Sequence, residues 1–259
     1  MKLALIALML CASSWGQTTA APKAAAAPKA TTAPKAATAP KAATAPKAAT
    51  APKAATATKA KAATKAKAEP VLDLMKPETI KGTPPSIFIV RLQTTKGDVD
   101  IRVVRNWAPN GVERFYNLVR AGFYDNAYFF RVLGFMAQVG INSKPAINRV
   151  WEDRNLFDDR VIQSNRRGMV TFASSGQPNS RSTQFFINKT DANTYLDQLK
   201  FAPFGEVVAG IEIVDMLYSG YGEPPIQGEL AEQGEAIITK SYPRMDKIIK
   251  ASVIAVPEP

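Results

Sequence analysis

A single arginine interrupts a long apolar run near the middle of the sequence. Residues 129–140 read FFRVLGFMAQVG, and Arg131 stands there among large apolar side chains. Burying an unpaired charge in an apolar environment costs several kcal/mol or more. Arg131 therefore either points into solvent or lines a cavity in which a cation has a chemical role. A guanidinium can donate hydrogen bonds to a carbonyl or an amide nitrogen without any change in its own protonation.

The residue types that are missing limit the chemistry available. The sequence contains no histidine, which excludes His-based triads and the usual general base at neutral pH. The only cysteine, Cys11, lies in an N-terminal segment that we expect to be removed, so the mature chain is expected to have no disulfide and no thiol chemistry. The acidic residues Asp153, Asp158 and Asp159 are expected to form solvated caps or turns rather than a cation site.

The first residues have the pattern of a targeting segment. Residues 1–10, MKLALIALML, place one lysine before an apolar run that is too short to span a bilayer, and small and polar residues follow. This pattern predicts a secretory signal peptide over residues 1–20, with a membrane anchor or a buried helix as alternatives. We therefore expect the protein to be exported, to the periplasm or the medium, with no transmembrane segment after cleavage.

A low-complexity segment follows, and it contains nearly all of the excess positive charge. The net charge is +11, but ten lysines and no acidic residue lie between residues 21 and 68, and the sequence from residue 69 onward is formally neutral. Six hexapeptides of the type APKAAT occupy residues 21–56. Regular prolines prevent a continuous helix, and alanine offers no large side chain to bury. We therefore predict a disordered, extended linker over residues 21–84.

The linker has two possible roles. The first is that of a spacer, with weak electrostatic contact to anionic envelope surfaces as a side effect. The second makes this basic arm the main function, in the manner of an adhesion protein. Nucleic acid is not expected as a partner, because a signal peptide precedes the arm.

The sequence from residue 85 onward predicts a β-rich domain. Residues 87–95 and 97–104 alternate as two strands of a hairpin, and residues 109–122 carry apolar positions on one helical face. A further helix is expected over residues 210–220. Additional strands are expected at 128–133, 135–140, 168–174, 183–188, 204–208 and 247–256. Many short strands with few helices favour a closed or nearly closed antiparallel barrel over residues 85–255, followed by a tail at 256–259.

These motifs together resemble one known family. FFRVLGFMAQVG, GMVTFASS and TQFFIN, in this order and spacing, resemble the cyclophilin family of peptidyl-prolyl cis-trans isomerases, and the similarity extends over roughly residues 86–255. The resemblance implies a mostly-β fold, a closed eight-stranded antiparallel barrel capped by two α-helices, with the active site in an outer groove. It also implies a bacterial secreted member that acts without a cofactor or a metal. A monomer is expected, because nothing in the sequence demands a larger assembly.

The chemistry of that family suits an arginine. Rotation about an X–Pro amide meets a barrier of about 18–20 kcal/mol, and the uncatalysed reaction takes about tens to hundreds of seconds. A dry groove that holds the twisted amide, with a donor aimed at it, lowers the barrier without a nucleophile, a metal or a proton carrier. By resemblance, Arg131 is the catalytic donor and Gln138 binds the substrate backbone and helps to hold Arg131.

The resemblance also assigns the substrate contacts. The expected substrate-binding residues are Phe130, Phe135, Met136, Ala173, Ser174, Gln184, Phe186, Tyr195, Leu196 and Phe201. Three of these depart from the common family pattern: Ser174 replaces an asparagine, Tyr195 replaces a tryptophan, and Phe201 or its neighbour takes the place of a histidine. Outside this set, Arg166, Arg167 and Arg181 are expected on the solvated surface, with the positioning of extended substrate or partners as the alternative. Trp151 is expected to be a packing residue.

The expected function is isomerisation of X–Pro bonds in exported proteins during folding, with proline-containing unfolded or extended chains as partners. The alternative of another class is a cyclophilin-like scaffold that binds extended peptides with little catalysis.

Overall fold

The computed structural model describes residues 72–223 and 226–255. The predicted signal peptide, the hexapeptide repeats and the tail at 256–259 lie outside these residues. Within them, no helix is long and apolar enough to cross a membrane.

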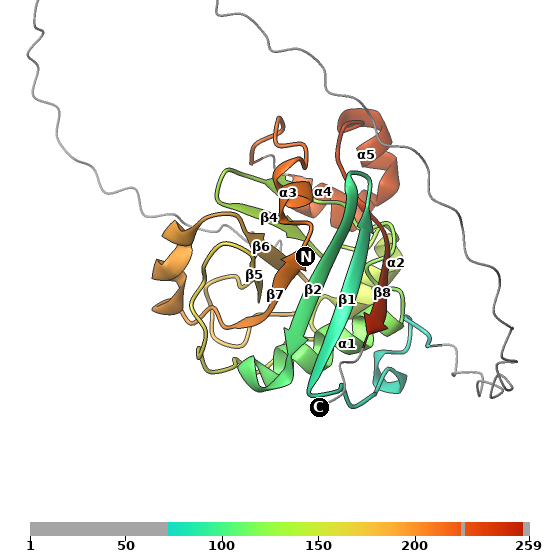
Figure 1. The fold of residues 1–259 in the computed structure, drawn as a ribbon. Coiled ribbons are helices and arrows are strands. Elements are labelled where there is room, and N and C mark those ends of the chain that lie inside the picture. Colours follow the sequence, from blue (N-terminus) through green and yellow to red (C-terminus); the bar gives the residue numbers. More distant parts are fainter. Residues whose placement is uncertain (1–71, 224–225, 256–259) are drawn as a thin grey trace, which may run out of the picture. The chain divides into compact units, whose positions relative to one another are not determined.

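The first two strands form the predicted hairpin. β1 (Ile87–Thr94) and β2 (Gly97–Val104) pair in register from Ile87 opposite Val104 to Thr94 opposite Gly97. Alternate side chains of β1 are buried, as the period of two requires. The two strands run side by side with β8, and α4 and α5 lie near the hairpin turn, whereas α1 lies toward the other end of the strands (Figure 1).

Six more strands complete one antiparallel sheet. They are β3 (Arg131–Val132), β4 (Met136–Val139), β5 (Met169–Phe172), β6 (Phe185–Asn188), β7 (Pro203–Ala209) and β8 (Ile248–Ala255). The order across the sheet is β3-β4-β6-β5-β7-β2-β1-β8. Eight antiparallel strands are confirmed, and every expected strand has a counterpart.

The two edges of the sheet do not join in a continuous ladder, so the expectation of a closed barrel is wrong. β3 and β8 are not hydrogen-bonded neighbours in the order of the sheet, and a single bridge links Tyr128 with Lys247, just before each of these strands. β3 has only two residues, which is too short to pair along the eight residues of β8. The sheet is therefore a half-barrel.

The helices are more numerous than expected. α1 (Pro109–Arg120) is the predicted amphipathic helix, and it buries Val112, Phe115 and Leu118 on one face. α3 (Ile211–Asp215) is shorter than the helix predicted over 210–220. Three helices have no counterpart among the predicted ones: α2 (Pro145–Trp151), α4 (Ile226–Gln233) and α5 (Glu235–Ser241). The family resemblance implied two α-helices, and the described residues contain five.

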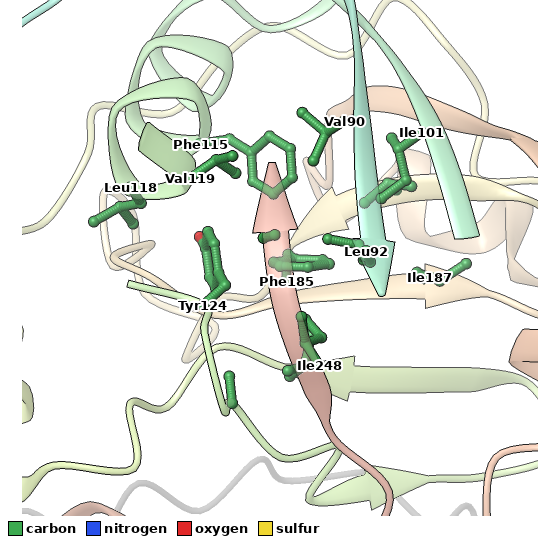
Figure 2. Packing of buried hydrophobic residues seen from close by; sticks show 14 of the residues in the cluster. Val90, Leu92, Ile101, Phe115, Leu118, Val119, Tyr124, Phe185, Ile187 and Ile248 are labelled. Atoms are coloured by element: carbon green, nitrogen blue, oxygen red, sulfur yellow. The ribbon is translucent and has the colours of Figure 1, made fainter. Parts of the chain in front are cut away.

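The main core lies between α1 and the concave face of the sheet. Phe185 is fully buried, and its ring meets those of Phe115 and Tyr124 edge-on, with centroids 5.3 and 5.2 Å apart. Figure 2 shows these three rings between α1 and the strands that carry Leu92 and Ile187. Burial raises the pKa of the Tyr124 hydroxyl, which donates to the Thr183 carbonyl oxygen at 2.9 Å.

A second apolar cluster joins α4 and α5 to the sheet edge. Ile226 and Leu230 of α4 are fully buried against Tyr128, Phe130 and other apolar residues of this cluster. The segment after residue 220 is therefore packed onto the domain through its own core, next to the strand that carries Arg131.

The folded body begins before residue 85, where the sequence analysis placed the end of the linker. Ile80 is buried in the main core, and Leu72 and Leu74 pack against it. The indole nitrogen of Trp151 donates to the Leu74 carbonyl oxygen at 2.9 Å, and Trp151 is buried, as the packing interpretation predicted. Residues 72–84 therefore contribute to the fold.

Candidate functional site

The short pairing of β3 with β4 brings Arg131 directly opposite Gln138. The Nη1 atom of Arg131 lies 3.4 Å from the Gln138 Oε1 atom. On the other side of β4, Gln138 lies opposite Phe186 of β6. Three neighbouring strands thus place a cation, an amide and an aromatic ring next to one another.

The period of two in these strands separates the site from the core. Arg131, Met136, Gln138 and Phe186 share one face of the sheet, which we call the Arg131 face. The intervening side chains of β4 and β6 point to the other face and are fully buried in the main core: Ala137, Val139, Phe185 and Ile187. Some of the apolar residues of FFRVLGFMAQVG therefore pack in the core, and others lie on the Arg131 face.

The Arg131 face is nearly dry. Met136, Gln138 and Phe186 are 5%, 7% and 3% exposed. The side chain of Arg131 is 17% exposed, and its guanidinium carbon lies 6.0 Å from the centroid of the Phe135 ring. Arg131 is therefore a largely buried cation in apolar surroundings, where hydrogen bonds to charged groups are stronger than in water.

Phe135 is held in place by its own main chain. Its carbonyl oxygen accepts hydrogen bonds from the Lys189 amide and from the Asn193 side chain, both at 2.9 Å. Asn193 is buried and also donates to Asn188 Oδ1 at 2.7 Å. The supporting role of Asn193 was not predicted, since an asparagine in a short polar segment carries no signal of burial.

Phe201 lies beside the ring of Phe186, with centroids 5.9 Å apart and planes inclined at 64°. The guanidinium carbon of Arg181 stands 5.2 Å from the centroid of the Phe201 ring. Arg181 also forms an ion pair with Asp158 and is only 7% exposed. The expectation that Arg181 is a solvated surface residue is therefore wrong: the guanidinium supports the aromatic ring.

Two more glutamines continue the polar contacts of the Arg131 face. Gln138 donates to the Gln184 side-chain oxygen at 2.9 Å, so Gln184 lies within reach of the site. Gln227, on α4, donates to the same oxygen at 3.3 Å. The connection to α4 was not expected from the sequence.

The remaining residues that were predicted to bind substrate differ in their exposure to solvent. Ala173 donates its amide to the Gln184 carbonyl oxygen at 2.9 Å, and Ser174 shares a hydrogen bond of 2.9 Å with Ser180. Tyr195 is 50% exposed. Leu196 follows it in the 3-10 helix at Asp191–Asp197 and is partly buried. The substrate roles of these residues stay predictions.

Phe130 precedes β3 and packs in the second apolar cluster, with the side chains of α4 and α5. It is 3% exposed. Its observed contacts are those of a packing residue, and its role in binding substrate stays a prediction.

Glu223 forms an ion pair with Arg131 that the sequence analysis did not anticipate. The Nε atom of Arg131 donates to Glu223 Oε1 at 2.9 Å, and Nη2 pairs with the same oxygen. Glu223 belongs to a segment to which the motifs assign no chemistry. Its position 92 residues from Arg131 leaves no local signal that could have identified it.

Asp158 and Asp159 make structural contacts, but both are partly buried, whereas solvated caps or turns were expected. The Asp159 carboxylate accepts from the backbone amides of Asn110 and Gly111 at 3.0 and 2.8 Å, at the start of α1. Burial raises the pKa of Asp159, against the effect of these two amides. No cluster of three or more His, Cys, Asp or Glu side chains that could hold a metal ion occurs in residues 72–223 and 226–255.

Comparison with known proteins identifies the family to which this arrangement belongs. The sequence model of the family described as "Cyclophilin type peptidyl-prolyl cis-trans isomerase/CLD" matches residues 89–233, which include the Arg131 face and most of the sheet. The chain is a cyclophilin. The resemblance carried by the FFRVLGFMAQVG motif is thus confirmed at the level of the family.

Curated relatives of this cyclophilin bear the same enzyme name. Peptidyl-prolyl cis-trans isomerase A of Dickeya dadantii is 33% identical over 135 residues, which span 49% of this chain and 70% of that protein. Peptidyl-prolyl cis-trans isomerase B of Escherichia coli is 31% identical over 136 residues, 50% of this chain and 83% of that protein. Peptidyl-prolyl cis-trans isomerase cyp15 of Rhizopus delemar is 36% identical over 134 residues, and there the match spans only 20% of the protein.

Solved structures include a cyclophilin type peptidyl-prolyl cis-trans isomerase from Cryptosporidium parvum. It is 24% identical to this cyclophilin, with a TM-score of 0.49, and the match covers 66% of this chain and 99% of that one. Cyclophilin AquaCyp293 from Hirschia baltica is 21% identical, with a TM-score of 0.47, over 71% of this chain and 81% of its own.

Proposed function

We propose that this cyclophilin catalyses rotation about X–Pro bonds in exported polypeptides through a non-covalent mechanism. Arg131 donates to the carbonyl that adjoins the twisting amide, and Gln138 holds both the substrate backbone and the guanidinium. Met136, Phe186 and Phe201 supply the apolar surroundings for the proline ring. In such surroundings, a preorganised donor stabilises the twisted state more than the planar one.

One observation carries the proposal. A largely buried guanidinium lies in contact with Gln138, across the strand pair, in a setting of apolar side chains. A structural ion pair would not require this cation to lie beside a glutamine and the Phe135 ring on a sheet face that is separate from the main core. That combination would stabilise an amide in rotation, because it supplies a fixed donor in surroundings that exclude water.

The test is isomerisation of a short Ala-Pro peptide by the purified full-length chain. We expect exchange between the cis and trans forms to become faster in proportion to enzyme concentration. Exchange spectroscopy measures both rates directly and does not require a coupled protease. Unaltered exchange at high enzyme concentration, with a folded chain, would reject catalysis.

The Glu223 contact favours a second candidate, a scaffold that binds extended peptides with little turnover. In the structure, Glu223 engages the donors of Arg131 that a substrate carbonyl would need. The same peptide separates the two candidates, because a scaffold would bind it in a titration without accelerating its exchange.

We also propose that residues 1–20 direct export and that residues 21–68 form a spacer with weak affinity for anionic envelope surfaces. The absence of acidic residues among ten lysines in the latter segment supports the second part. Fractionation of cells that express the full chain, or a chain without residues 21–68, tests both. We expect export of both chains and weaker retention of the shortened one on envelope material at low salt. Equal retention would remove the adhesion proposal, and a cytoplasmic full chain would remove the export proposal.

A further inference from the structure

Glu223 occupies the hydrogen-bonding positions of Arg131 that face away from Gln138. The Nε and Nη2 atoms of Arg131 both pair with Glu223 Oε1, while Nη1 lies near Gln138 Oε1 and 3.9 Å from the Met136 sulfur. Every nitrogen of the guanidinium is thus engaged. The Glu223 side chain is 51% exposed, against 17% for Arg131, so the carboxylate forms the outer half of the pair.

The described residues nearest to Glu223 in the chain have packing contacts of their own. Before it, Tyr221 packs edge-on against Tyr218 and Tyr242, with centroids 4.9 and 5.2 Å apart. Further along the chain, α4 is anchored by the fully buried Ile226 and by the contact of Gln227 with Gln184. The ion pair with Arg131 is the contact that places the Glu223 carboxylate itself.

A substrate would compete with this pair. A prolyl carbonyl that accepts from Arg131 would take donors that Glu223 now engages, and it would place the bound peptide beside the Glu223 carboxylate. The residue after proline lies only about one Cα–Cα step, ~3.8 Å, further along the chain. A lysine or arginine there offers Glu223 a new partner and would otherwise be repelled by Arg131. An acidic residue there would be repelled by the carboxylate of Glu223.

We propose that Glu223 is a specificity-determining residue that makes the enzyme favour X–Pro bonds followed by a basic residue. The proposal rests on the isomerase function proposed above and names its substrate class. The sequence itself contains X–Pro bonds that are followed by a basic residue. Each of the six hexapeptides in residues 21–56 contains Ala-Pro-Lys, in which lysine follows an alanyl-prolyl bond. A peptide from this repeat is therefore a suitable substrate with which to test the preference.

The experiment compares three synthetic peptides with the full-length chain. The first is AATAPKAAT, taken from the repeat, and the other two carry alanine or glutamate in place of the lysine. Exchange spectroscopy gives kcat/KM for each peptide, and titration gives each Kd. The chain's own Ala-Pro-Lys sequences could compete with the peptides for the site. Such competition would lower kcat/KM of all three peptides by the same factor, so the ratio of kcat/KM between peptides is the quantity to compare.

We expect the lysine peptide to exceed the glutamate peptide by about fivefold in kcat/KM at low ionic strength, the effect of a partly exposed ion pair. Added salt should reduce this ratio, because the charges are within reach of solvent. In Glu223→Gln, the ratio should fall to within about twofold. Glu232→Gln is the matched control: Glu232 is an exposed residue of α4, its replacement changes the net charge equally, and it should retain the preference.

Equal kcat/KM for the three peptides with the unaltered enzyme would overturn the proposal, and so would a preference that survives in Glu223→Gln. If none of the peptides is isomerised, the proposed function fails instead. The Kd values then decide whether Glu223 determines specificity. Tightest binding of the lysine peptide, with that advantage absent in Glu223→Gln, supports this role. Equal Kd values for the three peptides reject it.

Discussion

Replacement of Arg131 by alanine is expected to lower kcat/KM for a proline peptide by at least about tenfold, or ~1.4 kcal/mol of transition-state stabilisation. The reason is the loss of a preorganised donor in dry surroundings, an effect that reaches about 10²–10³ in other enzymes. The partner Glu223 is half exposed, so the loss of its counter-charge should cost the fold little. Exchange spectroscopy on the variant measures the effect, and thermal unfolding verifies the fold.

Two variants sharpen this test. Arg131→Lys retains the charge but lacks the planar fork, so it should recover only part of the activity if geometry matters. Arg102→Ala removes an arginine that forms an exposed ion pair with Glu206 between β2 and β7, away from the Arg131 face, and it should retain full activity. Normal activity in a folded Arg131→Ala chain would remove Arg131 from the mechanism.

Replacement of Phe185 by alanine is expected to lower the free energy of unfolding by about 3–5 kcal/mol. Phe185 is fully buried, and its ring contacts those of Phe115, Tyr124 and Phe204, so a cavity would open at the centre of the aromatic cluster in Figure 2. Domains of this kind are stable by about 5–15 kcal/mol, so the variant would lose a large fraction of its stability. Denaturant unfolding measures the change.

The matched control is Phe157→Ala, since Phe157 is 78% exposed. It should alter the free energy of unfolding by no more than about 0.5 kcal/mol. Equal effects of the two substitutions would contradict the assignment of Phe185 to the core.

Local pattern was sufficient for most of the fold. The alternation in residues 87–104 predicted the hairpin, and the apolar face of Val112, Phe115 and Leu118 predicted α1, because both depend on side chains close together in sequence. α4 and α5 were missed because their sequence, rich in Glu and Gly, has a weak apolar period; it is the packing of Ile226 and Leu230 on the sheet edge that stabilises them. The prediction of a closed barrel was wrong because β3 has only two residues, and no local pattern indicates the length of that strand.

The same division holds for the candidate site. The sequence by itself predicted that Arg131 lies in one strand and that Met136 and Gln138 lie in the next, and the family motif named Phe186 as a further wall of the site. Only the tertiary structure decided that Arg181 supports Phe201 and that Glu223 covers Arg131 from 92 residues away. Strand residues are placed by a period that the sequence carries, whereas a contact between distant segments depends on how loops and helices pack. The pairing of the Glu223 carboxylate with Arg131, and with it the proposed preference for a basic residue after proline, therefore depends on the tertiary structure.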